Sequence, residues 1–370
     1  MSKEEGASFL MAGGGTGGHV IPLLAVAREL RLRGHRPFFA GTRRGLEAKL
    51  VPAEGFPIEW IDIGGLKNVG PATAARTLWR LPAEIVHAAR MMRRLRTAAV
   101  FSLGGYVAGP VMLAAALRGV PVALMEANAM PGFTNRKAGR FVARALLGFP
   151  QAARYFPAGR TEVTGMPVRP EFFAIPPKPR GETLTVLVTG GSQGSRTLNR
   201  AVREAWPLLG RTPARIRLIH QTGAAAYPEI SEAFARAGVE GEVVAFLDNM
   251  PAAYARADLL VCRAGAGTVA ELAAAGKPSI LVPFPYAADD HQTHNARVLA
   301  GAGAAALVPD REMTGERLMA EILAAAAPGR LERMGEAARR FARPGAAARA
   351  ADLLEELGAG RWGHRGGAIS

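Results

Sequence analysis

The 370-residue sequence predicts an α/β protein made of two similar doubly wound domains that face a cleft. Near its start, the apolar run Ser8–Ala12 leads into the glycine-rich stretch 13–18 and then into a helical pattern. The second half opens in the same way, because Leu184–Thr189 is followed by glycines and a helix from Thr197. A stretch rich in proline and glycine at residues 165–181 separates the two halves and indicates a domain boundary.

The first glycine-rich turn predicts an anion site. Pro22 lies in the first turn of the helical pattern Val20–Arg33, and Gly34 follows its end, as expected for a helix. The glycines therefore join a strand to a helix, where the backbone approaches a ligand closely. The N–H groups and the dipole of a helix start both favour a phosphate or another oxygen-rich group.

A dinucleotide is a weaker reading of the same turn. Gly13, Gly15 and Gly18 match the dinucleotide fingerprint, which also requires an acid roughly 20 residues later. Residues 38–44 contain no Asp or Glu, so a plain NAD site is disfavoured. An NADP site with Arg43 or Arg44 on the 2′-phosphate stays open.

Alternating apolar and helical patterns continue along both halves. We expect strands at Ser8–Ala12, Pro37–Gly41, Ile58–Ile63, Ala98–Leu103, Val120–Met125, Ala143–Gly148, Glu162–Thr164, Leu184–Thr189, Ile216–Gln221, Val243–Leu247, Leu259–Arg263 and Ser279–Pro283. We expect helices at Val20–Arg33, Leu46–Glu54, 71–96, Pro110–Arg118, Ala224–Ala237, Met250–Ala257 and Ala346–Leu357, with further helices from Thr197 and between the glycine turn at Gly265 and Gly276. Residues from the helix start near His291 to Ala342 are expected to be helical, and the tail 358–370 to be disordered.

Composition limits the classes of function. A hydrophobic content of 49% indicates a globular protein with a sizeable core. The one cysteine, Cys262, lies in an apolar run, which predicts a buried thiol and excludes a disulfide framework. The first residues show no apolar signal segment, so we expect a cytoplasmic protein. The net charge of +15 suits anionic partners, but no nucleic-acid module is present, so we expect none.

Two segments could meet a membrane. Residues 97–117 carry no charge, but glycines and Pro110 interrupt them, so we predict a strand, a turn and a helix instead of a span. Residues 71–96 form a basic helical pattern that is either a core helix with a solvated face or an interfacial patch. In the second reading, Leu78 and Trp79 meet lipid while Arg76 and Arg80 meet anionic headgroups.

Several polar residues stand next to the glycine turns. His19 could accept a proton or cap its helix, and Glu271 could hold ribose hydroxyls or be a first-turn acid. Gln292 and Asn128 suit sugar hydroxyls, although such residues are more often caps. A metal is not expected at His291 and His294, which lack a third ligand.

Five motifs occur in an order that is specific when they are taken together. They are Gly14-Gly-Thr16-Gly-Gly18-His19-Val20-x-Pro22, Gly104-Gly-Tyr106-Val-x-Gly109-Pro110, Gly190-Gly-Ser-Gln-Gly194, Arg263-x-Gly265-Ala-x-Thr268-Val-x-Glu271 and His291-Gln292-x-x-Asn295-Ala296. Together they resemble the MurG family of bacterial cell-wall glycosyltransferases, over nearly the whole chain to about Leu357.

The resemblance implies a GT-B fold, with two Rossmann-like domains separated by a cleft. Residues 1–166, completed by a returning helix at 346–357, would form the acceptor and membrane domain, and 167–345 the UDP-GlcNAc domain. It implies inverting transfer of N-acetylglucosamine from UDP-GlcNAc to lipid I, forming lipid II, with no metal and no cofactor. The enzyme would act at the cytoplasmic face of the plasma membrane, peripherally; the oligomeric state is left open.

Family positions carry over residue by residue. His19 would be the general base, with Glu126 as the second candidate. The implied donor-binding residues are Thr16, Gly17, Gly18, Asn128, Arg169, Ser192, Leu247, Ala266, Gly267, Thr268, Val269, Ala270, Glu271 and Gln292. The acceptor pyrophosphate would lie near Gly14, Gly15, Gly104, Gly105 and Tyr106.

The chain departs from the family at Met125 and Ala127, where the family usually has His and Gln, and at Ala108, where it has Ser. The nearest rival functions are a UDP-GlcNAc 2-epimerase and a GT-B transferase with a soluble acceptor. A binding protein without turnover is the rival from another class.

Overall fold

The protein consists of two compact units. The structure, a computed structural model, describes residues 6–15, 17–64, 70–179, 181–212 and 214–363. Unit 1 comprises residues 1–168 with 345–370, and unit 2 comprises residues 169–344. The chain therefore leaves unit 1 once and returns to it with its last helix.

Unit 1 is built on a parallel sheet with the strand order β3-β2-β1-β4-β5-β6-β7 among its described residues. The strands are β1 (Ser8–Ala12), β2 (Arg36–Gly41), β3 (Ile58–Trp60), β4 (Thr97–Ser102), β5 (Val122–Glu126), β6 (Arg144–Leu147) and β7 (Thr161–Glu162). The helical segments are α1 (Gly17–Leu32), α2 (Glu47–Ala53), α3 (Pro71–Arg94), α4 (Ala108–Leu117), α5 (Phe133–Ala138), η1 (Gly139–Phe141), η2 (Pro150–Tyr155) and α14 (Ala346–Gly363).

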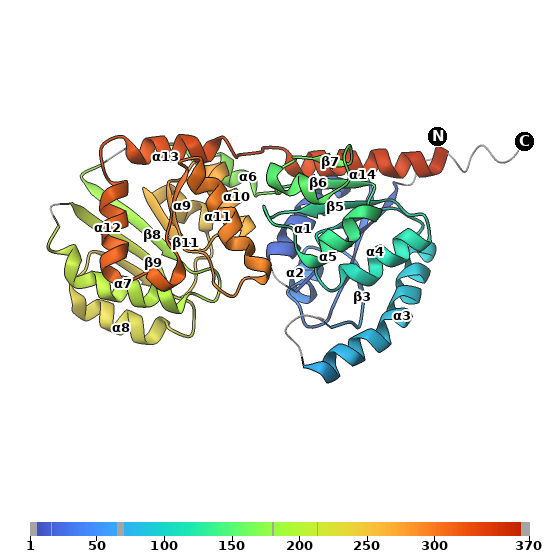
Figure 1. Cartoon of the computed structure of the whole chain (residues 1–370), viewed down its shortest axis with the longest axis horizontal. Coiled ribbons are helices and arrows are strands. Elements are labelled where there is room, and N and C mark those ends of the chain that lie inside the picture. The colour runs from blue at the N-terminus through green and yellow to red at the C-terminus, as the bar shows by residue number, and fades with distance from the viewer. Residues whose placement is uncertain (1–5, 16, 65–69, 180, 213, 364–370) are drawn as a thin grey trace, which may run out of the picture. The chain divides into compact units, whose positions relative to one another are not determined.

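Both faces of this sheet are buried, which explains why its central strands are apolar throughout. Phe9 and Met11 of β1 pack with α1 and α14, whereas Leu10 and Ala12 pack with α3 and α4. In Figure 1, α14 lies beside the strands of unit 1 although it ends the chain. Ion pairs fasten it there: Arg33 contacts Asp352 at 2.6 Å and Glu355 at 3.0 Å.

Unit 2 repeats the plan with the strand order β10-β9-β8-β11-β12-β13 among its described residues, again all parallel. The strands are β8 (Thr183–Thr189), β9 (Arg215–Gln221), β10 (Gly241–Val244), β11 (Leu259–Cys262), β12 (Ser279–Leu281) and β13 (Ala305–Leu307). The helical segments are α6 (Pro170–Phe173), α7 (Arg196–Leu209), α8 (Tyr227–Ala237), α9 (Met250–Arg256), α10 (Ala266–Ala275), η3 (Ala288–Asp290), α11 (His291–Gly301), η4 (Asp310–Glu312), α12 (Gly315–Ala325) and α13 (Arg330–Arg339).

Each sheet reverses its strand order once, between β1 and β4 in unit 1 and between β8 and β11 in unit 2. In open parallel sheets, ligands bind beyond the carboxyl ends of the strands at this point. The turns that follow these four strands are the glycine turns of the sequence. The predicted fold class, two Rossmann-like doubly wound domains, is confirmed.

Three predicted element positions are wrong. Residues 291–342 are not helical throughout, because the three-residue strand β13 interrupts them. The strand after α8 is Gly241–Val244, earlier than predicted. Residues 358–363 belong to α14 and not to a disordered tail, and Gly358 packs closely against Phe9 and Ala98. Among the described residues, no helix combines the length and the apolar character that crossing a membrane needs.

Candidate functional site

The first glycine turn places His19 at the switch point of unit 1. Gly15 adopts a φ of +92°, which favours glycine, and α1 begins two residues later. The Nδ1 atom of His19 lies 3.2 Å from the carbonyl oxygen of Gly14. A carbonyl only accepts hydrogen bonds, so Nδ1 carries the proton and the lone pair of the neutral ring is on Nε2. Thr16 lies outside the described residues.

A buried carboxylate supports this turn through a hydrogen bond to its backbone. Glu47, at the start of α2, is 1% exposed, and its Oε2 accepts the N–H of Gly15 at 2.8 Å. Its Oε1 accepts the N–H and the hydroxyl of Thr42, each at 2.9 Å. A side chain at Gly14 or Gly45 would overlap the carboxylate. The N–H of Gly15, predicted to lie near an anion, is therefore already occupied.

The turn after β4 adjoins the turn after β1. Gly104 and Gly105 have φ values of +83° and +82°, and a Cβ atom at Gly105 would lie 3.7 Å from Nδ1 of His19. The ring of Tyr106 lies against Gly15. The structure thus brings together the residues that the sequence assigned to the acceptor pyrophosphate and to the base.

Glu126 has a supporting position. It ends β5 and is buried, and its two carboxylate oxygens accept hydrogen bonds from the backbone of Asn128 and Gly132 and from the side chains of Asn128 and Asn135. Burial raises the pKa of Glu126, and these hydrogen bonds oppose the rise. The geometry makes Glu126 the anchor of the β5–α5 loop. Asn135, which also packs under Gly104, is a residue that the sequence analysis missed.

In unit 2, α10 begins directly after β11 at the switch point. Gly265 caps it with extended backbone and no side-chain hydrogen bond, and the N–H of Val269 already donates to the oxygen of Gly265. The three N–H groups before it, on Ala266, Gly267 and Thr268, precede the first helical bond and point out of the helix start. Such a helix start can bind an anion.

Glu271 faces Arg169 on the same unit. The atoms Oε1 of Glu271 and Nη2 of Arg169 are 3.9 Å apart, and the Glu271 side chain is 25% exposed. Burial raises the pKa of Glu271 to about 7, and Arg169 opposes the rise. Glu271 is the sixth residue of α10, so its position is not explained as a first-turn acid.

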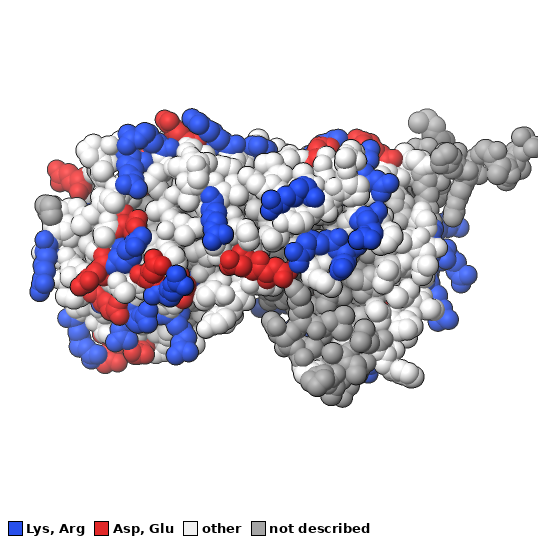
Figure 2. All heavy atoms as spheres, in the orientation of Figure 1, with Lys and Arg blue, Asp and Glu red and all other residues white. Residues whose placement is uncertain are grey.

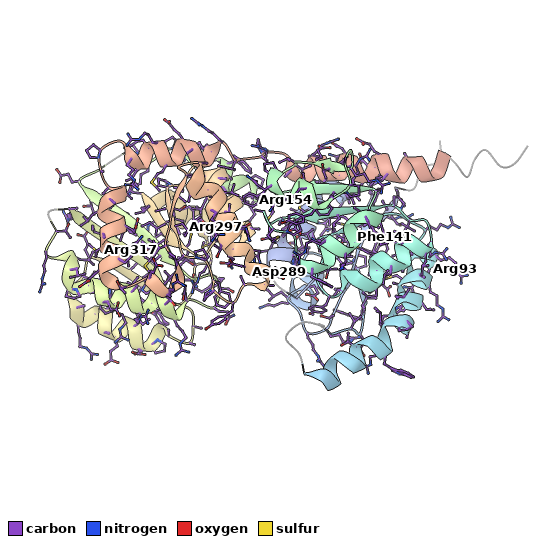
Figure 3. All side chains as sticks on the ribbon, viewed as in Figure 1. Arg93, Phe141, Arg154, Asp289, Arg297 and Arg317 are labelled. Atoms are coloured by element: carbon purple, nitrogen blue, oxygen red, sulfur yellow. The ribbon has the colours of Figure 1, made fainter. Side chains whose placement is uncertain are left out.

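Gln292 and Asn295 on α11 hold the segment before α10. The Oε1 atom of Gln292 accepts the N–H groups of Ala264 at 3.2 Å and Phe284 at 3.0 Å. Asn295 donates to the oxygen of Ala264 at 3.1 Å. Any ligand contact from Gln292 would therefore use its amide nitrogen. Asp289, labelled in Figure 3, precedes α11 with a φ of +53°.

The turn after β8 is held by side chains of β8, β9 and the segment after β11. Thr189 donates to Gln221, whose Nε2 donates to the oxygen of Gly191 at 2.9 Å. Ser192 is exposed in this turn, and Leu247 is half-buried in the segment after β10. Arg263 ties the turn to β12, because it donates to Ser195 Oγ at 2.7 Å and to the oxygen of Val282 at 3.0 Å.

The basic helix α3 carries an exposed aromatic side chain. Trp79 is 88% exposed, and Arg80 pairs with Asp62. Two other large apolar residues of unit 1 are also exposed, Leu117 of α4 and Phe141 of η1. Figure 3 labels Phe141. The side chains of Arg76 and Leu78 lie outside the described part of the chain. Figure 2 shows many Lys and Arg side chains on one face, with fewer acids among them.

One cavity of unit 2 lies away from these residues. It has a volume of about 450 Å³ and is lined by Thr183, Arg215, Asp258, Lys277 and Pro278, at the amino ends of the strands. The glycine turns lie at the opposite, carboxyl ends. Within the described residues, no three His, Cys, Asp or Glu side chains gather as a metal site would require.

Known proteins resemble this chain over both units. Residues 9–147 match the glycosyltransferase family 28 N-terminal domain, and residues 185–356 match the corresponding C-terminal domain. A protein of Solibacter usitatus is 62% identical over 95% of this chain and 96% of its own length. It is named UDP-N-acetylglucosamine--N-acetylmuramyl-(pentapeptide) pyrophosphoryl-undecaprenol N-acetylglucosamine transferase. The crystal structure of Acinetobacter baumannii MurG is 35% identical, with a TM-score of 0.80 and coverage of 95% of this chain and 99% of that one.

The chain belongs to the MurG family. An Anaeromyxobacter protein with the same name as the Solibacter relative is 47% identical over 97% of this chain and 96% of its own length. The glycotransferase of kitacinnamycin, at 20% identity and a TM-score of 0.71 over 95% of this chain and 99% of that one, shows the shared fold. The suspected family and its GT-B fold are thereby confirmed.

One supporting residue of this MurG-family site was missed in the sequence. Glu47 stands 32 positions from the glycine whose N–H it accepts. The only signal is the set of glycines at positions 14, 41 and 45, which leave room for its side chain.

Proposed function

We propose that this chain transfers N-acetylglucosamine from UDP-GlcNAc to the 4-hydroxyl of the muramoyl sugar of lipid I, forming lipid II. The observation that carries the proposal is that the switch points of the two units carry different chemical groups. Unit 1 presents a histidine with its Nδ1–H fixed on Gly14, and unit 2 presents an open helix start beside a carboxylate. Relatives that cover nearly the whole chain carry the name of this transferase.

The donor binds to unit 2 in this proposal. The N–H groups of Ala266, Gly267 and Thr268 receive the diphosphate, and Glu271 accepts the ribose hydroxyls. Leu247 contacts the uracil, with Arg169 and Ser192 at the nucleotide. The amide nitrogen of Gln292 binds the sugar, since its oxygen is used internally.

The reaction is a single displacement. The acceptor 4-oxygen attacks the anomeric carbon, the bond from that carbon to the diphosphate breaks, and the new β-1,4 bond forms with inversion. His19 takes the hydroxyl proton on Nε2, and UDP leaves with its charge held by the first turn of α10. We assign the base to His19, because both carboxylate oxygens of Glu126 already hold its own loop.

Backbone N–H groups that stabilise the leaving group make a metal dispensable in this proposal. The acceptor pyrophosphate lies at the first turn of α1 and at the turn of Gly104, Gly105 and Tyr106. Thr16, Gly17, Gly18 and Asn128 are further donor-binding residues in this proposal.

A lipid-linked acceptor requires docking at a membrane surface. We assign this role to the α3 face, which is defined as Trp79, Leu117 and Phe141 with the arginines of α3. The indole of Trp79 and the apolar side chains of Leu117 and Phe141 suit the membrane interface, and arginines suit anionic headgroups. The enzyme would thus work peripherally on the cytoplasmic face of the plasma membrane.

The test is UDP release from UDP-GlcNAc in EDTA, with and without a lipid I analogue. Acceptor-dependent release in EDTA is expected. Release that requires added Mg²⁺ would contradict the metal-free step. Saturable donor binding without release would favour a binding protein or a transferase with a soluble acceptor, and change at the sugar C2 without acceptor would identify an epimerase.

A further inference from the structure

We propose that Glu47 is a positioning residue for the transfer, acting on His19 through the peptide group that joins Gly14 to Gly15. This inference rests on the proposed function, in which His19 takes the proton of the acceptor hydroxyl. It adds a residue from α2, outside every motif that identified the family.

A single peptide group links the two side chains. Its N–H, from Gly15, donates to Oε2 of Glu47 at 2.8 Å, and its carbonyl, from Gly14, accepts from Nδ1 of His19 at 3.2 Å. The amide is planar and conjugated, so a carboxylate on its N–H increases the negative charge on its oxygen. The carboxylate, the amide and the imidazole therefore form one hydrogen-bonded chain.

This chain of bonds favours the reactive form of the ring. A more negative Gly14 oxygen strengthens the bond from Nδ1–H, which keeps the lone pair on Nε2. When Nε2 takes the acceptor proton, the ring becomes positive and the Glu47 charge stabilises it through the same amide. Condensed-phase cooperativity of about 10–30% per bond sets the scale of this effect.

The geometry requires a carboxylate and not merely a side chain of this shape. Two backbone N–H groups, from Gly15 and Thr42, reach different oxygens of Glu47. A glutamine has one acceptor oxygen, so its NH2 group would face one of these donors. The ring of Tyr106 also lies beside Gly15.

Thr42 supplies a matched control. Its hydroxyl donates to Oε1 of Glu47 at 2.9 Å, on the side of the carboxylate away from Gly15. Thr42→Val removes that bond but keeps the Glu47 charge and the bond to Gly15. A residue that only anchored the loop would respond alike to loss of either partner.

The experiment compares wild-type protein, Glu47→Gln and Thr42→Val, each labelled with ¹⁵N-histidine. The wild-type His19 signals should report Nδ1–H alone, and Glu47→Gln should show a mixture of tautomers. We expect kcat to fall about tenfold in Glu47→Gln, a part of the 10²–10⁴ that a general base contributes. The dissociation constant of UDP-GlcNAc should stay unchanged, and Thr42→Val should keep the wild-type tautomer and kcat.

Two outcomes would overturn the proposal. One is a wild-type His19 that is protonated on Nε2, a measurement that needs no variant to fold. The other is a Glu47→Gln protein with wild-type kcat or with unchanged His19 signals. Failure of the proposed function appears separately: if His19→Ala transfers at the wild-type rate, His19 is not the base, whatever its tautomer.

Discussion

The two units support their first glycine turns by opposite means. In unit 1 a buried carboxylate, Glu47, accepts the N–H of Gly15. In unit 2 the corresponding turn is held by donors: Gln221 donates to the oxygen of Gly191 at 2.9 Å, and Arg263 donates to Ser195 Oγ at 2.7 Å. Both turns join a strand to a helix, but the side chains that hold them differ in charge.

This difference separates two tasks. A negatively charged side chain next to the turn favours a ring that becomes positive when it takes a proton. In unit 2 the start of α10 offers free backbone N–H groups and the positive end of the helix dipole, which suits a diphosphate. Unit 1 is thus suited to proton transfer beside His19, and unit 2 to holding the charged donor.

Removing the ring from unit 1 should give the largest effect. His19→Ala should lower kcat by about 10²–10⁴, because a general base contributes that much. The dissociation constant of UDP-GlcNAc should stay within about twofold, since the residues assigned to the diphosphate, the ribose and the uracil lie on unit 2. Acceptor-dependent UDP release and calorimetric titration measure the two quantities. A variant that loses donor binding as strongly as turnover would break the division of tasks.

Acid should destabilise unit 2 at the buried contact between His220 and Asn199. His220 is 1% exposed and its Nε2 bonds to Asn199 Oδ1, and burial lowers its pKa to about 4 from 6.5. The unfolded chain binds this proton more readily, so stability is complete above pH 6.5 and falls as pH drops toward 4.

The loss should amount to about 3 kcal/mol over that window. Urea unfolding of unit 2, followed through Trp206, which packs on Phe234 in this unit, measures it. In His220→Gln, the pH dependence in this window should shrink. An equal slope in both proteins would assign the effect to other groups.

A variant of the donor site should lose UDP-GlcNAc binding, whereas the His19 variant should lose turnover. Glu271→Gln should weaken UDP-GlcNAc binding about tenfold to a hundredfold, as expected for loss of charge-assisted hydrogen bonds. Burial raises the pKa of Glu271 to about 7, so wild-type affinity should fall as pH drops below 7. Titrations between pH 5.5 and 8.5 test this, and the variant should show a flatter profile.

The smallest expected effect concerns the α3 face. Trp79→Ala should reduce binding to vesicles that contain anionic lipid several-fold, because an exposed indole is lost from the interface. Leu32→Ala is the control, since this exposed residue ends α1 on the other face of the sheet. Equal losses in co-sedimentation with vesicles would rule out a specific docking face.

The sequence predicted the elements that are encoded by short-range patterns of residues. Apolar strands followed by glycine turns and helices gave both sheets and their switch points, because these patterns are short-range. Residues such as Glu47 and Asn135 could not be predicted in this way. Their partners are set by packing between elements, and no spacing of residues encodes it.

Short and glycine-containing segments were misplaced for related reasons. The strand β13 has three residues, fewer than a periodic pattern needs. The prediction of a disordered tail from residue 358 follows the rule that the ends of a chain are often poorly ordered. Gly358 instead allows α14 to lie close against Phe9, and this contact outweighs the low helix propensity of glycine.

The return of α14 to unit 1 has a consequence for biosynthesis. On the ribosome, residues 1–168 emerge before the helix that covers Phe9, Met11 and Phe101 has been translated. The nascent chain therefore carries an open apolar face while all of unit 2 is synthesised. Unit 2 is continuous in sequence, so it can fold before unit 1 is complete. A chaperone that binds apolar surfaces would therefore bind unit 1, which is translated earlier.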